Sequence, residues 1–375
     1  MKLILQIKLK PNSEQKKSLL NTIKEANTAC NELSEFAFGN KVFNQFKLHR
    51  AKYHSIKSSF NLSAQAVVRC ISKVADSYKL DKKKQRVFKE LGSITYDSRI
   101  LSYNIEKRIC SIWSADGRLK MPFIPYPEKY LPYIKGEADL IYRKGKFYLF
   151  QTCEVPEEDI KDVEEWLGID FGLVEIATLS NGKRFSSKSL NDYREKRQKI
   201  RSSIDSKGTR NCNKLLKRLS GKERTHCKII NHTISKAIVK EAKESGKGIA
   251  LENLKGIRFT ANNRGKKHRT RLGKWSFHQL RQMIEYKAKK EGVPVIAVNP
   301  AYTSQMCNFC FRIGKRKGKI FKCENCKTIS DADENAAKNI ALLGRQVNSP
   351  FEKSNMYCSI SHIYSGLKLP ALAVE

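Results

Sequence analysis

Four cysteines form the pattern in this sequence that most directly predicts a metal site. Cys307 and Cys310 make one CxxC pair, twelve residues follow, and Cys323 and Cys326 make a second pair. Each pair can present two thiolates from a tight turn, so the two pairs together supply the sulfur ligands of a tetrahedral structural zinc site. No ligand position is left for water, which is typical of a zinc ion without a catalytic role. A redox-active thiol pair is the alternative interpretation.

Three carboxylates stand where predicted strands end or a predicted helix begins. Asp170 ends an apolar strand in GIDFG, Glu252 ends another in IALENL, and Asp333 opens a helix in DENAAKN. A single carboxylate at such a place is usually a helix cap or a solvent-exposed strand end. In an RNase H-like sheet, however, the first and fourth strands lie side by side and a C-terminal helix crosses them, so all three positions would converge.

Converging carboxylates repel one another unless cations neutralise their charge. Hard oxygen ligands of this kind select Mg²⁺ or Mn²⁺. Two such ions about 4 Å apart activate a water molecule and stabilise the leaving oxygen of a phosphodiester. The three positions together therefore predict metal-dependent phosphodiester chemistry.

The elements that must position these residues follow one another in the second half of the chain. After an acidic segment at 154–165, which we interpret as a linker, WLGIDFGLVEIATLSNGKRF predicts three strands. Residues 188–245 are basic and helical, with an apolar stripe along one face. The strand GIALENL, the helix FHQLRQMIEYKAKKEG, the strand PVIAVN, the cysteine pairs and a last helix come next. This order predicts an α/β domain with the cysteine pairs inserted near its end.

The N-terminal part of the chain begins with a strand and continues with helices. Strict alternation in residues 2–9 indicates a half-buried strand. Asn12, followed three residues later by Gln15, predicts a capping box at the start of a helix. A second helix is expected over residues 62–79, with Ser63 as its N-cap.

A second β-rich region follows these helices. Residues 94–153 consist of short runs of β-formers separated by turn signals. The economical architecture is one small β-barrel, formed by residues 1–11 and 91–155 and interrupted by a helical insertion at 12–90. Small barrels and basic helices both bind oligonucleotides well.

The charge of the chain predicts a polyanionic partner. Lys and Arg number 73 against 37 Asp and Glu in 375 residues, which gives a formal net charge of +36. This excess far exceeds what solubility requires and suits strong, salt-sensitive binding along many phosphates. Residues 258–274 alone carry seven Lys or Arg, which we assign to nucleic-acid backbone contact. A ribosomal-type protein or a merely solvated basic surface is the alternative interpretation.

Neither a membrane nor an oxidising compartment is expected. The sequence has no run of about 18 apolar residues, and MKLILQIKLKPNSEQ lacks the features of a signal peptide. The seven cysteines outside the two pairs are scattered singly, which favours a reducing compartment. We therefore expect the protein in the cytoplasm, associated with the nucleoid when bound to DNA. No particular oligomeric state is predicted.

Four stretches carry a family resemblance over residues 164–345: GIDFGLVEIAT, LENLKGI, the run from WSFHQLRQ to TSQMCNFC, and CENCKTISDADENAAKNI. They resemble the successive motifs of the TnpB family, transposon-encoded nucleases similar to the compact type V CRISPR effectors. The resemblance implies a RuvC (RNase H-like) nuclease domain at 160–303 and 329–345, interrupted by a zinc ribbon at 304–328. Residues 346–375, where the pattern ends, are expected to form a flexible tail.

Membership of that family implies an RNA-guided DNA endonuclease, in which a guide RNA selects double-stranded target DNA beside a short motif read by the protein. By position, Asp170, Glu252 and Asp333 are implied to be the catalytic residues that hold Mg²⁺ or Mn²⁺, and the four ribbon cysteines to hold zinc. Asp331 is the alternative ligand, but Asp333 directly precedes ENAAKN as in the family motif. Lys327 stands where many relatives have glycine, which affects only the local turn.

Three other functions fit part of the pattern. A transposase or resolvase would use the same carboxylates without a guide RNA. A guide-directed DNA-binding repressor would not cut, and the presence of all three carboxylates argues against it. A plain zinc-ribbon DNA-binding module would leave those carboxylates unexplained.

Overall fold

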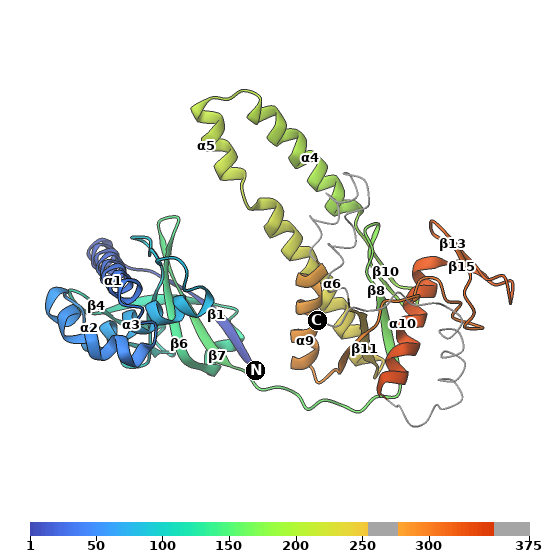
Figure 1. Cartoon of the computed structure of the whole chain (residues 1–375), viewed down its shortest axis with the longest axis horizontal. Helices are drawn as coiled ribbons and strands as arrows, with labels where there is room; N and C mark the ends of the chain where they lie inside the picture. Colours follow the sequence, from blue (N-terminus) through green and yellow to red (C-terminus); the bar gives the residue numbers. More distant parts are fainter. Residues whose placement is uncertain (254–276, 349–375) are drawn as a thin grey trace. The chain divides into compact units, whose positions relative to one another are not determined.

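The structure, a computed structural model, describes residues 1–253 and 277–348. The chain divides into two compact units, residues 1–156 and 157–375, and each is described by itself (Figure 1). The predicted basic loop at 258–274 lies outside the described residues, and so does the predicted tail beyond residue 348.

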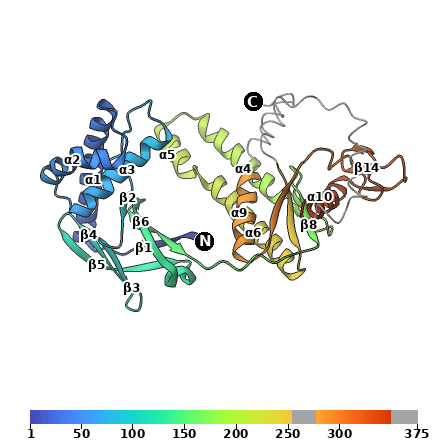
Figure 2. The same ribbon diagram turned by 60° about the horizontal axis from the view of Figure 1, so that its bottom comes forward.

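A seven-stranded antiparallel sheet forms the basis of the first unit (Figure 2). In spatial order its strands are β2 (Ile94–Tyr96), β6 (Ile134–Arg143), β7 (Lys146–Glu154), β1 (Lys2–Leu9), β5 (Gly117–Tyr126), β4 (Ile109–Ser114) and β3 (Leu101–Asn104). The edge strands β2 and β3 are separated in the chain by only four residues, 97–100. The sheet therefore curls into a nearly closed barrel, and the 3-10 helix η1 (Glu128–Tyr133) connects β5 to β6.

The alternation predicted for β1 is confirmed. Leu5, Ile7 and Leu9 are buried in the core, whereas Ile4 is exposed and Lys8 is only half-buried. Because successive side chains of a strand point to opposite faces, Ile4 and Lys8 lie on the outer face of the barrel.

Three helices are inserted after β1, and both predicted caps are confirmed. The Asn12 side chain accepts a hydrogen bond of 2.8 Å from the Gln15 amide, and the Gln15 side chain accepts one from the Asn12 amide. The Ser63 hydroxyl accepts from the Ala66 amide at 3.2 Å. The three helices are α1 (Ser13–Gly39), α2 (Gln45–Ser59) and α3 (Ala64–Leu80).

A five-stranded sheet lies at the centre of the second unit. In spatial order its strands are β10 (Arg184–Ser186), β9 (Glu175–Leu179), β8 (Trp166–Asp170), β11 (Gly248–Glu252) and β12 (Val295–Val298). β8 and β11 are parallel neighbours, so the predicted adjacency of the first and fourth strands is confirmed. One face packs against α6 (Lys222–Glu244) and α9 (Phe277–Lys290), and α10 (Ala332–Asn348) crosses the other (Figure 1). α10 ends at Asn348, inside the segment predicted as a tail.

Gly168 lets α10 lie directly on β8. A Cβ atom at this position would be 2.0 Å from the carbonyl oxygen of Ala337 and 2.4 Å from the amide nitrogen of Ala341. Any side chain here would push the helix away from the sheet, so the glycine in GIDFG fixes the position of α10.

The basic stretch at 188–245, predicted to be helical, forms three helices. α4 (Lys188–Asp205) and α5 (Arg210–Leu219) project from the sheet before α6 returns to it (Figure 1). Thr209 caps α5 through its hydroxyl, and Gly221, with φ of +81°, begins α6. Within residues 1–253 and 277–348, no helix combines the length and apolar character that crossing a membrane requires.

The cysteine pairs lie in a small three-stranded antiparallel sheet between β12 and α10. Its strands are β13 (Lys315–Lys317), β14 (Ile320–Lys322) and β15 (Ile329–Asp331). β15 pairs with β14, although the predicted ribbon ends at residue 328. The ribbon sheet therefore runs directly into α10.

Candidate active site and metal centre

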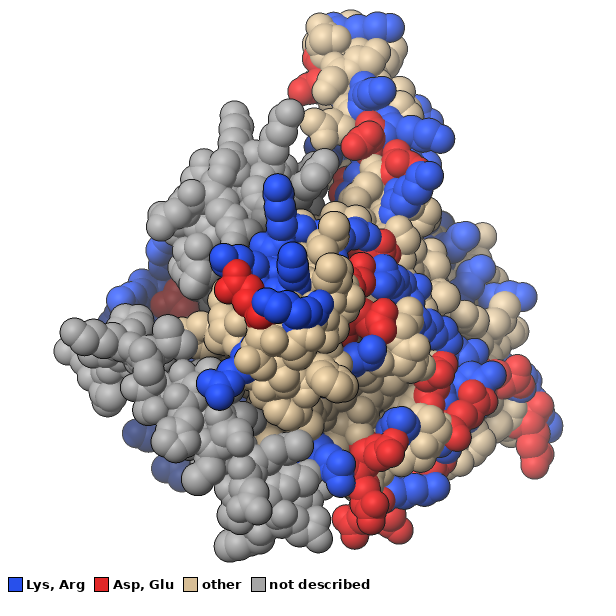
Figure 3. All heavy atoms as spheres, turned by 90° about the vertical axis from the view of Figure 1, so that its right-hand side faces the viewer, with Lys and Arg blue, Asp and Glu red and all other residues tan. Residues whose placement is uncertain are grey.

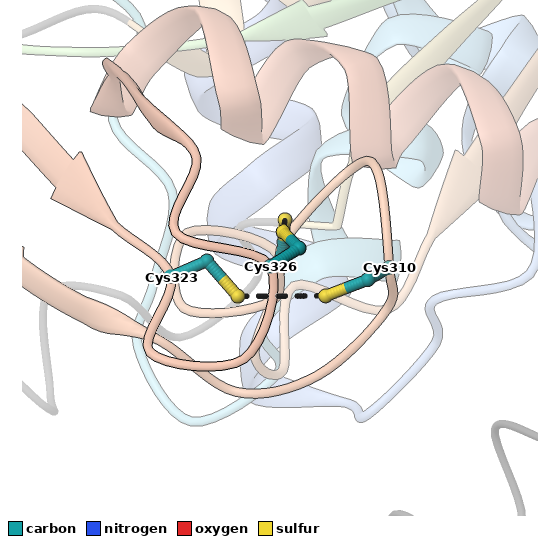
Figure 4. Close-up of side chains that lie close together, drawn as sticks. Cys310, Cys323 and Cys326 are labelled. Carbon is teal, nitrogen blue, oxygen red and sulfur yellow. Dashed lines mark hydrogen bonds between the residues drawn. The ribbon is translucent and has the colours of Figure 1, made fainter.

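The four cysteines of the ribbon come together at one point. All four sulfur atoms lie within 4.8 Å of one another. The sulfurs of Cys310 and Cys323 are 3.4 Å apart (Figure 4). Those of Cys307 and Cys326 are 3.6 Å apart. Four sulfurs bound tetrahedrally to zinc at about 2.3 Å are roughly 3.8 Å from one another. The spacing therefore fits a single zinc ion.

Both cysteine pairs end in the same backbone turn. Phe311 and Lys327, the residues that follow Cys310 and Cys326, have φ of 59° and 61°. The Phe311 amide donates a hydrogen bond of 2.9 Å to the Cys307 carbonyl. Lys327 thus adopts a left-handed conformation that glycine accepts freely and other residues adopt at a cost of about 1 kcal/mol.

Hydrogen bonding favours a thiolate at one of the four positions. The Cys326 sulfur lies 3.1 Å from the Thr328 hydroxyl, and hydrogen bonds from the side chain and backbone of Thr328 lower the pKa of Cys326 to about 6. Burial instead raises the pKa of Cys307 to about 12. Since metals bind the thiolate form, Cys326 is already disposed to act as a ligand.

Two buried asparagines of α10 hold the first cysteine turn in place. Asn335 accepts from the Asn308 amide at 3.0 Å and donates to the Met306 carbonyl at 2.7 Å. Asn339 donates to the carbonyls of Met306 and Thr303, at 2.6 and 2.8 Å. These hydrogen bonds join the ribbon to α10, which also carries one of the predicted carboxylates.

The three predicted carboxylates gather at the carboxyl end of the central strands. The parallel register of β8 and β11 pairs Ile169 with Leu251, so the next residues, Asp170 and Glu252, leave the sheet at the same edge. Asp333 lies in the first turn of α10, which crosses both strands. Three residues far apart in sequence therefore form one acidic cluster.

Burial and the charges of neighbouring side chains shift the pKa values of these carboxylates. Burial and the negative charges of Glu252 and Asp333 raise the pKa of Asp170 to about 7. Burial also raises the pKa of Glu252, while a hydrogen bond from Thr303 and the charge of Arg316 oppose this shift. Burial is the largest cause of both shifts, so the surroundings of Asp170 and Glu252 favour neutralisation of their charge by a proton or by a cation.

Sequence reasoning missed two residues that complete the cluster. The Thr303 hydroxyl donates a hydrogen bond of 2.5 Å to Glu252 and is itself buried. The Arg316 guanidinium lies 2.8 Å from the Asp333 carboxylate. Arg316 belongs to β13, so the ribbon brings a positive charge to the carboxylates. Its neighbours Lys315 and Lys317 are equally exposed cations of the same strand, so the sequence carries no signal that separates Arg316 from them.

The two candidate aspartates at the start of α10 have different partners. One oxygen of Asp331 accepts from the amides of Asp333 and Glu334, at 3.0 and 3.1 Å, and thereby caps the helix. The other oxygen lies 3.1 Å from Arg184. Both oxygens of Asp331 are therefore engaged in structural contacts, which favours Asp333 as the metal ligand.

Basic side chains are exposed along α5, one of the projecting helices of the second unit. α5 carries four cations and no acidic residue, and none of its side chains is buried: Arg210, Lys214, Lys217 and Arg218. Figure 3 shows Lys and Arg along these helices at the top of the view. Such a surface suits contact with phosphates.

Comparison with known proteins finds relatives of the second unit and of its ribbon. The family model described as Cas12f1-like, TNB domain, matches residues 277–340. A TnpB-like protein of Methanocaldococcus jannaschii is 33% identical over 159 residues, which are 42% of this chain and 57% of that protein. The CRISPR-associated endodeoxyribonuclease Cas12f1 of Sulfoacidibacillus thermotolerans is 33% identical over 221 residues, which are 53% of this chain and 51% of that protein.

The chain is similar to TnpB-like proteins and to Cas12f1 endodeoxyribonucleases over about half of its length. It spans little more than half the length of the curated relatives it matches. Among solved structures, the Cas12f1 chain of a Cas12f1-sgRNA-target DNA complex matches this chain with a TM-score of 0.61. That match covers 88% of this chain and 83% of the other at 16% identity, so the two proteins share a fold.

Proposed function

We propose that this protein is a member of the TnpB family and an RNA-guided, metal-dependent DNA endonuclease with a RuvC-type nuclease domain and an inserted zinc ribbon. The observation that carries the proposal is the acidic cluster of Asp170, Glu252 and Asp333 at the ends of β8, β11 and the start of α10. The nuclease names of its relatives, and its fold shared with a protein solved with sgRNA and target DNA, support it.

In this proposal the acidic cluster holds Mg²⁺ or Mn²⁺. Asp170, Glu252 and Asp333 would provide the oxygen ligands. Burial and the neighbouring carboxylates raise the pKa of Asp170 to about 7, a shift that a bound cation would oppose. When bound there, the metal ions supply an activated water and stabilise the leaving oxygen of a phosphodiester.

The remaining residues of the site orient these groups and moderate their charge. Thr303 fixes the rotamer of Glu252 by donating to one oxygen, which leaves the other free to bind a cation. Arg316 provides positive charge beside Asp333, where an approaching phosphodiester needs it. Asp331 keeps α10 capped, so the first turn that carries Asp333 stays formed.

The four cysteines would bind one structural zinc ion. All four positions of a tetrahedron are filled by sulfur, so this ion would have no open position for a substrate. Its function would be to stabilise the ribbon and thereby to hold Arg316 beside the carboxylates.

Sequence specificity would come from a guide RNA that pairs with double-stranded target DNA. The protein would hold the resulting heteroduplex by its backbone, for which the cations of α5 are suited. A guide-independent transposase or resolvase is the competing function, because it would use the same acidic cluster.

Guide dependence is the direct test. We would express the protein together with the DNA that flanks its gene, sequence the RNA that co-purifies, and offer a plasmid library matched to that RNA. We expect cleavage of matched plasmids only with both RNA and Mg²⁺, and loss of cleavage after ribonuclease treatment. Equal cleavage of the same targets by RNA-free protein would support the transposase or resolvase function instead.

A further inference from the structure

Asp331 brings a fourth carboxylate close to the acidic cluster. It lies two residues before Asp333, at the end of β15. After burial and the charges of Glu252 and Asp333, the charge of Asp331 is a further cause of the raised pKa of Asp170. A carboxylate this near to the cluster is a potential fourth ligand for a cation bound there. If three carboxylates are to coordinate the metal, another side chain has to hold Asp331 away from it.

Arg184 engages the oxygen of Asp331 that the helix cap does not use. The Oδ1 atom of Asp331 accepts hydrogen bonds from the first amides of α10. The Oδ2 atom lies 3.1 Å from Nη1 of Arg184, and Nη2 of the same guanidinium lies 3.5 Å from Glu334. A guanidinium presents several donors in a fixed planar arrangement, so it can hold two carboxylates at once. Arg184 thus holds acidic residues on both sides of Asp333.

A tight turn between β9 and β10 directs Arg184 toward α10. Gly182 in this turn has φ of +87°, a left-handed conformation that favours glycine. Successive residues of an extended chain point to opposite faces of a sheet. Accordingly, Lys183 pairs with Glu241 of α6 at 2.7 Å, whereas Arg184 pairs with the residues around the start of α10, on the other face. The backbone of this hairpin therefore determines which of the two cations meets α10.

We propose that Arg184 is a positioning residue that keeps Asp331 from coordinating the metal ions, so that Asp333 is the ligand from α10. The assignment rests on the proposed function, because that function places Mg²⁺ or Mn²⁺ at the cluster. Mg²⁺ requires a nearly ideal octahedral arrangement of ligands, whereas Ca²⁺ accepts about six to eight oxygens in flexible arrangements. A fourth carboxylate released toward the site would favour Ca²⁺. Arg184 thereby also sets the preference of the site for Mg²⁺.

The test compares how Ca²⁺ and Mg²⁺ bind to the zinc-loaded full chain in the absence of nucleic acid. Binding of Mn²⁺ is followed by the loss of the EPR signal of the free ion, and Ca²⁺ or Mg²⁺ is then titrated in to displace it. Asp170→Ala serves as the blank, because it lacks one ligand of the site. The Mn²⁺ that this variant still binds is subtracted from every other measurement.

We expect Arg184→Gln to raise the affinity for Ca²⁺ relative to that for Mg²⁺ by about 10- to 100-fold, the range over which groups that orient metal ligands act. Removal of a positive charge alone would tighten the binding of both ions equally, since both carry the same charge. Adding Asp331→Asn, which keeps an oxygen for the helix cap, should restore the wild-type ratio of the two affinities.

Lys183→Gln is the matched control, because it removes one positive charge from the same hairpin on the side of α6. This variant should keep the wild-type ratio of Ca²⁺ to Mg²⁺ affinity. In guided cleavage with Mg²⁺, Ca²⁺ should inhibit Arg184→Gln at a concentration about 10- to 100-fold lower than for wild type or for Lys183→Gln.

An unchanged ratio in Arg184→Gln would overturn the proposal, whether both ions bind more tightly, as for a screening charge, or more weakly, as for a loss of structure. A changed ratio that persists after Asp331→Asn is added would also overturn it, because Asp331 would not be its cause. In these cases the proposed function stands. Wild type that binds no more Mn²⁺ than Asp170→Ala would instead contradict the metal site of the proposed function, and this proposal with it.

Discussion

The cysteine cluster and the carboxylate cluster are assembled in opposite ways. The four cysteines lie within residues 307–326 and are brought together by two similar turns. Asp170, Glu252 and Asp333 come from distant parts of the chain and meet only because β8 pairs with β11 and α10 crosses both. One cluster is a local property of sequence spacing, whereas the other is a property of the whole domain.

The two clusters differ in the size of the hydrophobic core that supports them. The buried core of the ribbon consists of Cys307, Phe321, Cys323 and Ala332, and two of these are themselves proposed ligands. So small a core requires a metal for stability. The sheet that carries the carboxylates has its own large core against α6 and α9. The carboxylate positions should therefore persist without metal, whereas the ribbon should not.

The largest expected effect is the loss of zinc from the ribbon. Cys323→Ser should reduce the zinc content from one ion per chain to none, because it removes one of four ligands. The ribbon then loses a binding free energy of about 10–16 kcal/mol, while circular dichroism should show that the rest of the fold survives. Elemental analysis of freshly purified protein measures the zinc. Cys212→Ser, at a half-buried cysteine of α5, is the control and should keep the ion; a full zinc complement in Cys323→Ser would contradict the proposed site.

The next largest effect concerns cleavage. Asp170→Ala, Glu252→Ala and Asp333→Ala should each slow guided cleavage by at least about 100- to 1000-fold, since each removes charge stabilisation from the chemical step. Binding of matched target, measured by gel shift, should stay near wild type because pairing and backbone contacts supply it. Asp331→Ala should keep most of its activity and lose only a helix cap, worth about 1 kcal/mol. The reverse result for Asp331 and Asp333 would show that the ligand assignment is wrong by two residues.

A smaller effect is expected at Thr303. Removing a group that orients a metal ligand typically costs 10- to 100-fold in metal affinity or activity. Thr303→Val should therefore raise the Mg²⁺ concentration needed for half-maximal cleavage, whereas Thr303→Ser should restore the wild-type value. A Thr303→Val enzyme that is slower but has an unchanged Mg²⁺ dependence would show that Thr303 does not act through Glu252.

The smallest effect tests the turn after the second cysteine pair. Lys327→Gly should stabilise the ribbon by up to about 1 kcal/mol, because glycine adopts the left-handed conformation without strain. The measurement is zinc retention against increasing chelator. Lys322→Gly, in a strand of the same sheet, is the control and should lose zinc more readily. If Lys327→Gly also loses zinc more readily, the strain at this turn is negligible.

Sequence reasoning succeeded where a local signal determines the structure. The alternation of β1 and the caps at Asn12 and Ser63 follow from such signals. The adjacency of β8 and β11 was predicted instead from the strand order of an RNase H-like sheet. It missed α2, whose charged sequence buries only Leu48 and Ile56 and so lacks a clear apolar stripe.

The contacts that complete the site could not be predicted in the same way. Thr303 and Arg316 reach Glu252 and Asp333 only through tertiary packing, and no spacing rule connects them. Asn335 and Asn339 lie in a motif that the sequence did identify. Their partners are backbone carbonyls and amides, which every residue type offers, so the sequence does not indicate these hydrogen bonds.

The contact between Gly168 and α10 also sets the rotational phase of that helix. Asp333 precedes Ala337 by four residues and Ala341 by eight, so all three lie near one side of the helix, the side that faces β8. A single residue inserted between Asn335 and Ala337 would turn Asp333 by about 100° relative to that contact. It would also turn Asn339 out of phase with Asn335, although both side chains donate to the Met306 carbonyl.

The hairpin tip around Gly318, by contrast, has open space beside its backbone. Changes in chain length should therefore be tolerated at that tip and not in the first two turns of α10.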